Sequence, residues 1–260
     1  MTETVPKIIW ILWFQGWEEA PIIVKKCLNT WIEHNPDWTI NKLTNDNLSD
    51  FIDIEAIIPG YKQKSIPPET LSDIIRIALL NKYGGIWVDS TLYCNIPLNN
   101  WLHKVISNSG FFAFANPGPD RMLSNWFLVS YENNTIIQKW YEEVVKYWST
   151  RNKRDNYFWS HYLFADIYNF ENEFKRAWDN TPKFSADAPH HFLPYDKTFY
   201  EKLTKQEKKI IDTTTIPVFK LTHKYDTDKA FKGSVIHYLV YNPINNNLFE
   251  KILNFIRRNK

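Results

Sequence analysis

The amino-acid sequence predicts an α/β fold with a mixed, mainly parallel central sheet and a mainly helical second half. Two observations support this prediction. Apolar runs of strand length alternate with amphipathic segments of helix length through the first hundred residues, which is the pattern of a doubly wound sheet. Beyond residue 130, most segments repeat their apolar side chains at helical spacing.

The first elements predict a β-α-β unit. Residues 7–13 form an apolar run, as expected for a strand that is buried on both faces. A helix over 22–34 follows, with Pro21 at a position that favours its first turn. The alternating pattern over 38–43 then predicts a second strand. This order predicts a right-handed parallel crossover.

The stretch over 70–91 predicts a helix, a turn and a strand in succession. The helix would bury one apolar face, made of Leu71, Ile74, Ile75, Ala78 and Leu79. Gly84 or Gly85 can adopt the left-handed conformation that ends a helix. Residues 86–88 then predict a short strand with Asp89 at its carboxyl end. Ligands bind at this end of the strands in open α/β sheets.

The remaining segments add antiparallel strands and helices. Residues 111–115 and 125–129 predict strands, with the loop 116–119 between them. The other expected elements are a short helix near 47–51, helices over 134–149, 157–170 and 172–179, short strands within 217–223 and 234–238, and a final helix containing Leu248 to Ile256.

The composition narrows the class of protein. The net charge of the 260 residues is only +2, so nothing in the charge calls for a nucleic-acid partner. Aromatic residues make up 17% of the chain; packing in the core accounts for most of them, and the rest can stack on sugar rings or bases. Cys27 and Cys94 form no metal-binding or disulfide pattern, as in a reducing compartment.

The sequence also bears on location. The first residues lack a secretion-signal pattern, and no apolar run approaches about 18 residues, so we expect a cytoplasmic protein. Peripheral contact with a membrane surface is an alternative, because the chain ends in the basic residues 257–260.

Three charged residues stand in and after the central helix. Asp73 and Arg76 are three positions apart and therefore neighbours on the helix, and Asp89 ends the next strand. An arginine can bind phosphate oxygens, a carboxylate can accept sugar hydroxyls, and a further carboxylate can hold a divalent cation. A surface ion pair and a loop carboxylate are the structural alternative, and the spacing alone leaves both open.

The string from 71 to 91, LSDIIRIALLNKYGGIWVDST, resembles the nucleotide-sugar-binding core of the capsular polysaccharide synthesis proteins. It is similar also to the related sugar transferases that carry an Asp-X-Asp motif. Residues 7–21, 157–164 and 220–222 resemble other blocks of the capsular family. The resemblance implies a GT-A fold with one domain over 1–260. Residues 1–130 would bind the nucleotide sugar, and a mainly helical part with a C-terminal helix would lie on the acceptor side.

The resemblance also implies roles for single residues. Asp73, Arg76 and Asp89 would be catalytic. The donor would be bound by Trp10, Trp13, Gln15, Asp73, Arg76, Asp89, Ser90 and Thr91. Asp89 matches the first Asp of Asp-X-Asp, whereas Thr91 stands where the wider pattern has its second Asp. A hydroxyl is a weaker ligand than a carboxylate for Mg²⁺ or Mn²⁺.

A divalent cation, Mn²⁺ or Mg²⁺, is the cofactor that the resemblance implies, held by Asp89 and Thr91. His237 or His223 would complete the site, and a structural or surface histidine is the alternative for each. On the acceptor side we expect Tyr157, Trp159 and His161 to line the site, with packing in the core as the alternative for such aromatic residues.

These implications predict a glycosyltransferase. It would move a sugar from a nucleotide-diphosphate donor, such as a UDP-hexose, to a glycan or lipid-linked glycan acceptor in capsule or surface polysaccharide synthesis. Relatives that retain the anomeric configuration make retention the expected outcome. The alternative is a degenerate GT-A protein that binds carbohydrate or nucleotide sugar without turnover. No Gly-X-Gly-X-X-Gly turn follows the first strand, which argues against a dinucleotide-dependent enzyme.

Overall fold

The computed structural model describes residues 4–106, 109–194 and 198–242. The contacts divide the chain into two compact units, each assembled from separate stretches of sequence. The first unit contains residues up to 18, 37–89 and 103–186, and the second contains 19–36, 90–102 and those from 187 on. The units thus interleave along the chain, and the functional division expected near residue 130 stays a prediction. A single domain over 1–260 stays a prediction.

A five-stranded mixed sheet forms the centre of the first unit. Its order is β2 (Thr39–Leu43), β1 (Ile8–Leu12), β3 (Gly85–Asp89), β6 (Arg121–Ser130) and β5 (Phe111–Gly118). Strand β1 pairs in parallel with β2 and β3, and β6 is antiparallel to both β3 and β5. Four strands therefore run in one direction and β6 runs in the other. The predicted α/β class with a mixed, mainly parallel sheet is confirmed.

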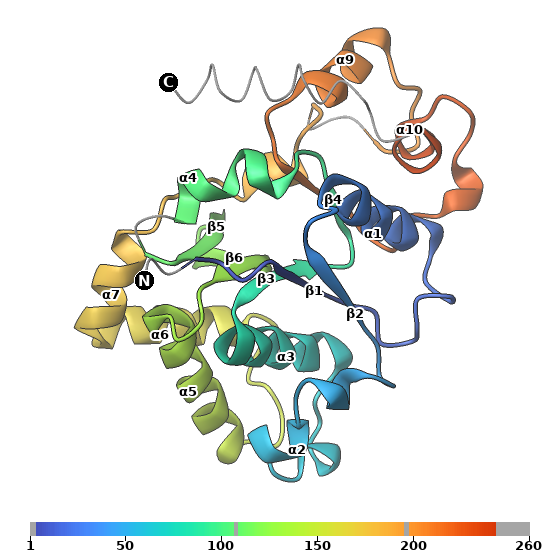
Figure 1. Cartoon of the computed structure of the whole chain (residues 1–260). Helices are drawn as coiled ribbons and strands as arrows, with labels where there is room; N and C mark the ends of the chain where they lie inside the picture. Colours follow the sequence, from blue (N-terminus) through green and yellow to red (C-terminus); the bar gives the residue numbers. More distant parts are fainter. Residues whose placement is uncertain (1–3, 107–108, 195–197, 243–260) are drawn as a thin grey trace. The chain divides into compact units, whose positions relative to one another are not determined.

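Helices of the first unit cover one face of this sheet (Figure 1). They are α3 (Pro68–Tyr83), α5 (Thr135–Ser149), α6 (Trp159–Phe170) and α7 (Asn172–Asp179). The predicted helical character beyond residue 130 is confirmed here, because three of these four helices follow β6 along the chain. The short helix α2 (Ile54–Ile57) and the 3-10 turn Leu48–Asp50 precede α3.

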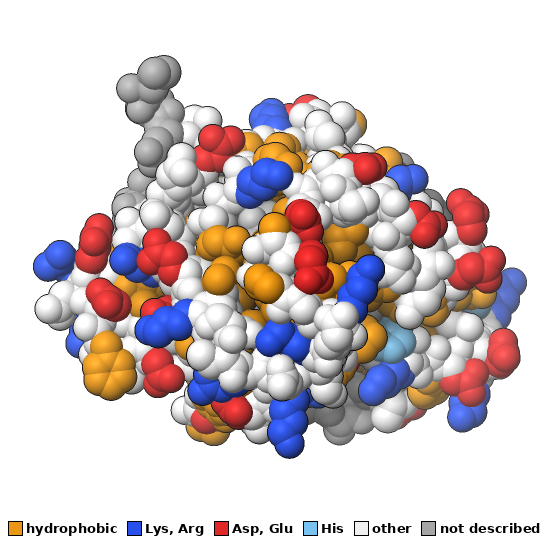
Figure 2. Space-filling view, turned by 90° about the horizontal axis from the view of Figure 1, so that it is seen from below, with side chains coloured by type: hydrophobic (Ala, Val, Ile, Leu, Met, Phe, Trp, Pro, Cys, Tyr) orange, Lys and Arg blue, Asp and Glu red, His pale blue; other side chains and the backbone are white. Residues whose placement is uncertain are grey.

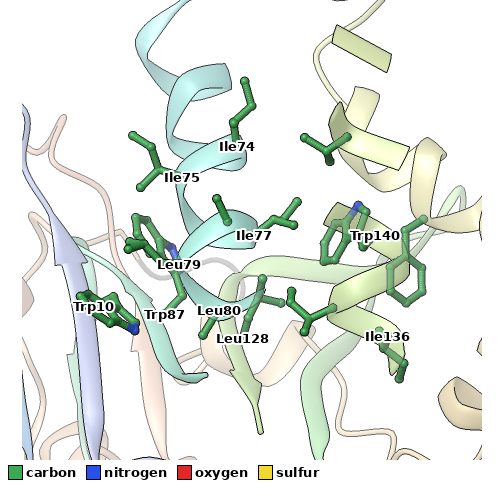
Figure 3. Close-up of a cluster of buried hydrophobic side chains, with 14 of the residues drawn as sticks. Trp10, Ile74, Ile75, Ile77, Leu79, Leu80, Trp87, Leu128, Ile136 and Trp140 are labelled. Carbon is green, nitrogen blue, oxygen red and sulfur yellow. The ribbon is translucent and has the colours of Figure 1, made fainter. Parts of the chain in front are cut away.

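The apolar side of α3 forms the centre of the core. Its Ile74, Ile75, Ile77, Ala78, Leu79 and Leu80 side chains are all buried. Figure 3 shows α3 between Trp10 and Trp87 of the strands and Ile136 and Trp140 of α5. Burial of such side chains is worth about 1.5–3 kcal/mol each, so packing of this layer is a large stabilising contribution.

A double-glycine turn connects α3 to β3. Gly84 and Gly85 have φ of +62° and +89°, a region that side-chain-bearing residues avoid. A Cβ atom on Gly85 would lie 2.6 Å from the Ile8 carbonyl oxygen, and one on Gly84 would lie 2.9 Å from the Glu132 nitrogen. Both glycines are therefore needed, because the backbone conformation and the close neighbours exclude a side chain at either position.

The second unit contains a two-stranded antiparallel sheet of β4 (Leu92–Cys94) and β7 (Val218–Lys220). Helix α1 (Ile22–His34) packs on β4, and its Trp31 indole donates a hydrogen bond to the Leu92 carbonyl oxygen over 2.8 Å. The observed α1 has the predicted bounds. The remaining helices of this unit are α8 (Asp187–His190), α9 (Lys205–Thr213) and α10 (Val235–Tyr241), whereas α4 (Leu102–Ile106) lies almost entirely in the first unit.

Two local predictions are corrected. Residues 234–238 were expected as a strand, but they begin helix α10. The Ser234 hydroxyl caps this helix by accepting a hydrogen bond from the His237 amide, and residues 235, 236, 239 and 240 bury one helical face. The expected loop 116–119 is shorter, because β5 continues to Gly118 through irregular pairing with β6. The predicted helix from Leu248 to Ile256 lies outside the described residues.

The surface reflects the nearly balanced charge of 31 basic and 29 acidic residues. Figure 2 shows one face, on which Lys and Arg side chains mix with Asp and Glu side chains around exposed hydrophobic groups. Among the residues that the structure describes, no helix is long and apolar enough to cross a membrane.

Candidate functional site

Asp73, Arg76 and Asp89 meet in the first unit. From Arg76 to Gly84 helix α3 advances about 12 Å, and from Gly85 to Asp89 strand β3 returns about 13 Å, so the tight turn brings Arg76 level with Asp89. Arg76 Nη1 lies 3.2 Å from Asp73 Oδ1, and Nη2 lies 3.3 Å from Asp89 Oδ1. The sequence-predicted trio is therefore brought together at the carboxyl end of β3.

This trio is not a surface ion pair. The side chain of Arg76 is 6% exposed, that of Asp73 is 13% exposed and that of Asp89 is 26% exposed. Burying charges is unfavourable unless each is paired and hydrogen-bonded. The structural alternative of an exposed helix pair is thereby excluded. Asp89 is the most accessible of the three and is the carboxylate best placed to meet a ligand.

Every guanidinium nitrogen of Arg76 has a protein oxygen close by. Nε donates to the Ser72 carbonyl oxygen over 3.2 Å, and Nη2 donates to the Ser72 hydroxyl over 3.0 Å. Nη1 donates to the Asn125 carbonyl oxygen over 2.8 Å. These contacts come in addition to the two carboxylates. Arg76 is thus held rigidly and in turn holds Asp73 and Asp89, so its geometry is that of a positioning residue.

Trp87 supports the same site from strand β3. It lies two residues before Asp89 and therefore points to the same side of the strand. Its indole nitrogen donates to Asp89 Oδ1 over 3.0 Å, and its ring lies 5.1 Å from the Arg76 guanidinium carbon. The aromatic ring therefore fixes the Asp89 carboxylate and gains a cation–π contact.

Asp73 is enclosed by polar side chains from other elements. Asn125 on β6 donates to Asp73 Oδ1 over 2.9 Å, and Ser160 on α6 donates to Oδ2 over 3.4 Å. Burial raises the pKa of Asp73 to about 6, with Asp89 adding to the increase, whereas Arg76 and Ser160 act in the opposite direction. Asp73 therefore changes charge near neutral pH, which a carboxylate in water does not.

His161 follows Ser160 and is buried beside the site. Burial, and then the positive charges of Arg76 and Arg121, lower the pKa of His161 to about 3. The imidazole is therefore neutral at physiological pH. Within the described part of the chain, its Nδ1 atom is buried and has no hydrogen-bond partner. The predicted place of His161 on the acceptor side stays a prediction.

The other two predicted acceptor-side residues differ in exposure. Tyr157 is 61% exposed, with the Arg154 guanidinium carbon 5.2 Å from its ring centre. Its assignment stays a prediction. Trp159 is buried against Tyr147 and Trp148, with ring centres 5.0 and 5.4 Å away. A ring enclosed in this way packs α6 against α5, so the expected wall of an acceptor site is corrected to a core position.

Trp10 also has a packing role. It is 2% exposed, lies against Phe51 and Tyr83, and donates its indole hydrogen to the Gly84 carbonyl oxygen over 3.0 Å. The expectation that Trp10 binds the donor is therefore corrected, because its ring is enclosed in the core. Trp13 is half-buried just after β1, and Gln15 is exposed in the following loop. Their roles toward a donor stay predictions.

Ser90 and Thr91 form the turn after β3. Thr91 is buried in the second unit, and its hydroxyl accepts a hydrogen bond from Lys220 Nζ over 2.6 Å. Lys220 is half-buried at the end of β7, and the Leu221 amide donates to the Thr91 carbonyl oxygen over 3.0 Å. The backbone and the side chain together therefore hold the Thr91 turn against β7.

Lys220 makes the surroundings of Thr91 positive. Burial is the main cause that lowers the pKa of His190 to about 4, and Lys220 is the next. Burial, Lys224 and Lys220 also lower the pKa of His223, which lies in the loop after β7. His237, the other predicted metal ligand, lies on helix α10 and not in the expected strand. Its ring centre is 4.9 Å from that of Tyr241. A divalent cation does not fit at the Thr91 hydroxyl, because the Lys220 ammonium already binds that oxygen and repels like charge.

Over the described ranges, no group of three or more His, Cys, Asp and Glu side chains is arranged to hold a metal ion. The metal roles expected for Asp89, His223 and His237 stay predictions, whereas the Lys220 ammonium opposes the one expected for Thr91.

A hollow elsewhere in the first unit shows no comparable chemistry. Its volume is about 320 Å³, and it is lined by Ile52, Asp53, Ala56, Ile57, Ala78, Asn81, Lys82 and Tyr141. Asp53 caps α2 by accepting from the amides of Glu55 and Ala56, and Lys82 donates to the Phe51 carbonyl oxygen. The charged groups there support local structure, so the trio at the end of β3 remains the better candidate.

Five residues of these networks were missed as site residues: Ser72, Trp87, Asn125, Ser160 and Lys220. Trp87 had a detectable signal, because residues two apart on a strand share a face. Asn125 stands next to the apolar residues 126–129 of β6, where a polar side chain needs a hydrogen-bond partner. The contact of Ser160 with Asp73 joins residues 87 positions apart, and that of Lys220 with Thr91 joins residues 129 apart, so no local pattern predicts either.

A rigid carboxylate–arginine cluster at the carboxyl end of a parallel strand defines an α/β protein with a ligand site of the doubly wound type. The sequence matches the family model described as Capsular polysaccharide synthesis protein over residues 1–239. The chain therefore belongs to the capsular polysaccharide synthesis protein family, and the resemblance seen in the sequence is confirmed.

Curated relatives share part of this chain. It is 28% identical over 163 residues to the O-glycosyltransferase braB of Annulohypoxylon truncatum, which is 56% of this chain and 38% of that protein. It is 23% identical over 177 residues to the O-glycosyltransferase PaGT of Phomopsis amygdali, which is 57% of this chain and 40% of that protein. The chain thus spans about two fifths of the length of these relatives.

Similar solved structures include the PaToxG glycosyltransferase. That structure is 18% identical, has a TM-score of 0.43, and the match covers 81% of this chain and 85% of that one. The UDP-bound glycosyltransferase domain of the YGT toxin is 11% identical with a TM-score of 0.36, over 56% of this chain and 62% of that one.

Proposed function

We propose that this protein is a glycosyltransferase that moves a sugar from a nucleoside-diphosphate donor to a hydroxyl group of an acceptor. The observation that carries the proposal is the buried trio Asp73, Arg76 and Asp89, held rigid by Trp87 and Asn125 at the carboxyl end of β3. Family membership and relatives named as glycosyltransferases support it.

The trio suits recognition of a sugar. Sugar hydroxyls donate hydrogen bonds, and Asp89 is a carboxylate with an exposed part that can accept them. Asp73 is more deeply buried, so it influences the bound sugar through its contacts with Arg76 and Asn125. Pre-positioned groups of this kind favour a transition state because they need not reorganise during the reaction.

The reaction exchanges one bond at the sugar. The bond from the anomeric carbon to the diphosphate oxygen breaks, and its electron pair leaves with the diphosphate. The acceptor oxygen forms the new bond to that carbon, and its proton passes to an oxygen of the departing diphosphate. The acceptor attacks from the same face of the sugar that the diphosphate leaves, so this route needs no separate protein base and gives the retained configuration that we propose.

The finer assignment is also a proposal. We take a UDP-hexose as the donor and a glycan or lipid-linked glycan of a capsule or surface polysaccharide as the acceptor. Two relatives, braB and PaGT, are named O-glycosyltransferases, which supports transfer to an oxygen atom. The cytoplasm, with peripheral contact to a membrane carrying the acceptor, is the proposed location.

The test is release of UDP from a panel of UDP-sugars, with and without oligosaccharide acceptors, detected by ion-exchange chromatography. Wild-type protein is expected to release UDP, and Asp89→Asn is expected to lose the activity. Asp50→Asn is the matched control, because Asp50 is an exposed carboxylate in a 3-10 turn. Binding of UDP-sugars by calorimetry without any product over the panel would favour the alternative, a binding protein without turnover.

A further inference from the structure

Tyr157 is an exposed aromatic residue of the first unit, close to the candidate site. It is 61% exposed, and it directly precedes helix α6, which brings Ser160 to the Asp73 carboxylate. The Arg154 guanidinium carbon lies 5.2 Å from the Tyr157 ring centre, and the Phe158 ring meets the Tyr157 ring edge to face at 5.0 Å. Protein groups therefore support the ring, and much of its surface stays open to a ligand.

Contacts on both sides hold Arg154 and its neighbours in place. Arg154 donates to the Thr70 hydroxyl over 2.7 Å and pairs with the Glu69 carboxylate over 2.8 Å, so it is tied to the first turn of α3. The Asp155 amide donates to the Tyr147 hydroxyl of α5 over 2.8 Å. A surface that is fixed in advance loses little conformational entropy when a ligand binds.

These contacts place Tyr157 on the ligand side of the sheet. Arg76 is level with Asp89 at the carboxyl end of β3, so the earlier residues of α3 extend beyond that end. Glu69 lies two helical turns before Arg76, about 10 Å along the helix axis. Because Arg154 joins Tyr157 to Glu69, the exposed ring lies past the strand end, where ligands bind in open α/β sheets.

The charges beside Tyr157 suit a neutral ligand. Arg154 is paired with Glu69. Arg151 is paired with Asp155 over 3.1 Å. These pairs carry no net charge, and they offer both donors and acceptors of hydrogen bonds. Sugar hydroxyls use both kinds of partner, and the C–H groups of a sugar ring pack on an aromatic face.

We propose that Tyr157 is a stacking platform for one sugar unit of the acceptor, and that the enzyme therefore prefers acceptors of two or more sugar units. This inference rests on the proposed function. The platform lies about 10 Å from the level of Asp89, so the sugar bound there is not the unit that reacts. That remote unit adds binding energy without taking part in the bond exchange. Arg154 is a positioning residue, because it acts through the Tyr157 ring.

The first experiment measures glycan binding by the wild-type protein. Fluorescently labelled protein is applied, in the presence of UDP, to an array of glucose, galactose, mannose and N-acetylglucosamine as single sugars and as their di- and tetrasaccharides. We expect at least one series to bind about fivefold more strongly as a disaccharide than as a single sugar. Equal binding of single sugars and longer chains, or binding of no chain in the array, would overturn the inference.

The second experiment tests Tyr157 through the KM for the acceptor, measured as UDP release with the array chain that binds best. Tyr157→Ala is expected to raise this KM by about tenfold while kcat falls by less than about twofold, because only binding remote from the reacting atoms is lost. Tyr157→Trp should keep the KM within about threefold of wild type, since an indole ring also stacks. A wild-type KM in Tyr157→Ala would contradict the assignment.

Phe170→Ala is the matched control for Tyr157→Ala. Phe170 is an aromatic residue at the other end of α6 and is 83% exposed, so its removal should leave glycan binding and the KM as in the wild type. Thermal unfolding of each variant identifies any loss of fold.

The inference and the proposed function fail in different ways. No release of UDP by the wild-type protein from any donor, with or without the array chains, would overturn the proposed function. Release that is equal for Tyr157→Ala and wild type at every acceptor concentration would overturn only the platform.

Discussion

The carboxylate cluster of the first unit and the Thr91–Lys220 pair of the second unit differ in sign and in burial. The cluster combines two carboxylates with one guanidinium and places a protein oxygen near each nitrogen of Arg76. The pair combines one ammonium with a neutral hydroxyl. Hydroxyl groups of a neutral sugar suit the first region. Changes in the cluster should therefore alter turnover, and they should lower stability more than a change at Lys220 does.

Removal of the charge at Arg76 is expected to have the largest effect. Arg76→Met leaves Asp73 and Asp89 without their shared cation in a buried setting, which should lower the free energy of unfolding by about 3–5 kcal/mol. Lys220→Met should lower it by only about 1–2 kcal/mol, because Lys220 is half-buried and gives up a contact to a neutral hydroxyl. Urea unfolding measures both values. Equal losses would remove the distinction between the two regions.

Asp89→Asn is the next largest change. It keeps the size of the side chain but removes the charge that pairs with Arg76 and accepts sugar hydroxyls. Turnover of the nucleotide sugar should fall by about a hundredfold or more, whereas UDP affinity should change by less than about threefold. Steady-state kinetics and calorimetry separate the two effects. An equal loss in both would mean that Asp89 binds the diphosphate as well.

Asp73→Asn should change how stability depends on pH. The pKa of Asp73 is about 6 in the folded protein, and it is about 3.9 in an unfolded chain. Between these values the folded protein binds the extra proton, so this group lowers wild-type stability as pH rises from about 4 to about 6. Asp73→Asn has no ionisable group at this position, so its stability does not fall for this reason as pH rises. Its stability relative to wild type should therefore increase by on the order of 2 kcal/mol from pH 4.5 to pH 7.

Urea unfolding at several pH values measures this difference, with Asp50→Asn as the exposed control. A difference between Asp73→Asn and wild type that is the same at every pH would show that Asp73 does not titrate in this range. Turnover should increase with pH through the same range if the ionised carboxylate is the active form.

Trp10→Phe should have the smallest effect. The change removes the hydrogen bond from the indole to the Gly84 carbonyl oxygen and some packing volume, for a loss of about 1–2 kcal/mol. Donor affinity should stay within about twofold of wild type, because the side chain lies in the core. Thermal unfolding and calorimetry test this pair of expectations. A large loss of affinity with little loss of stability would restore Trp10 to the donor site.

Much of the first unit was predictable from local pattern. Side-chain period and turn residues identified β1, α3 and β3, and in the second unit helix α1 has the predicted bounds. The trio was also predictable, since Asp73 and Arg76 are neighbours on one helix and a tight turn brings Asp89 alongside. The prediction of a strand over 234–238 was wrong, because a short apolar run fits a buried helix as well as a strand. The Ser234 cap favours the helix.

The sequence by itself determined the fold class, the family and the three charged residues, because side-chain period and motif spacing are local properties. Only the tertiary structure decided the partners of those residues. Asn125 and Ser160 reach Asp73 from β6 and α6, and Lys220 reaches Thr91 from β7. Burial likewise separated Trp10, a core residue, from Asp89, a partly exposed one. These contacts join residues far apart in the chain, and packing rather than local spacing brings them together.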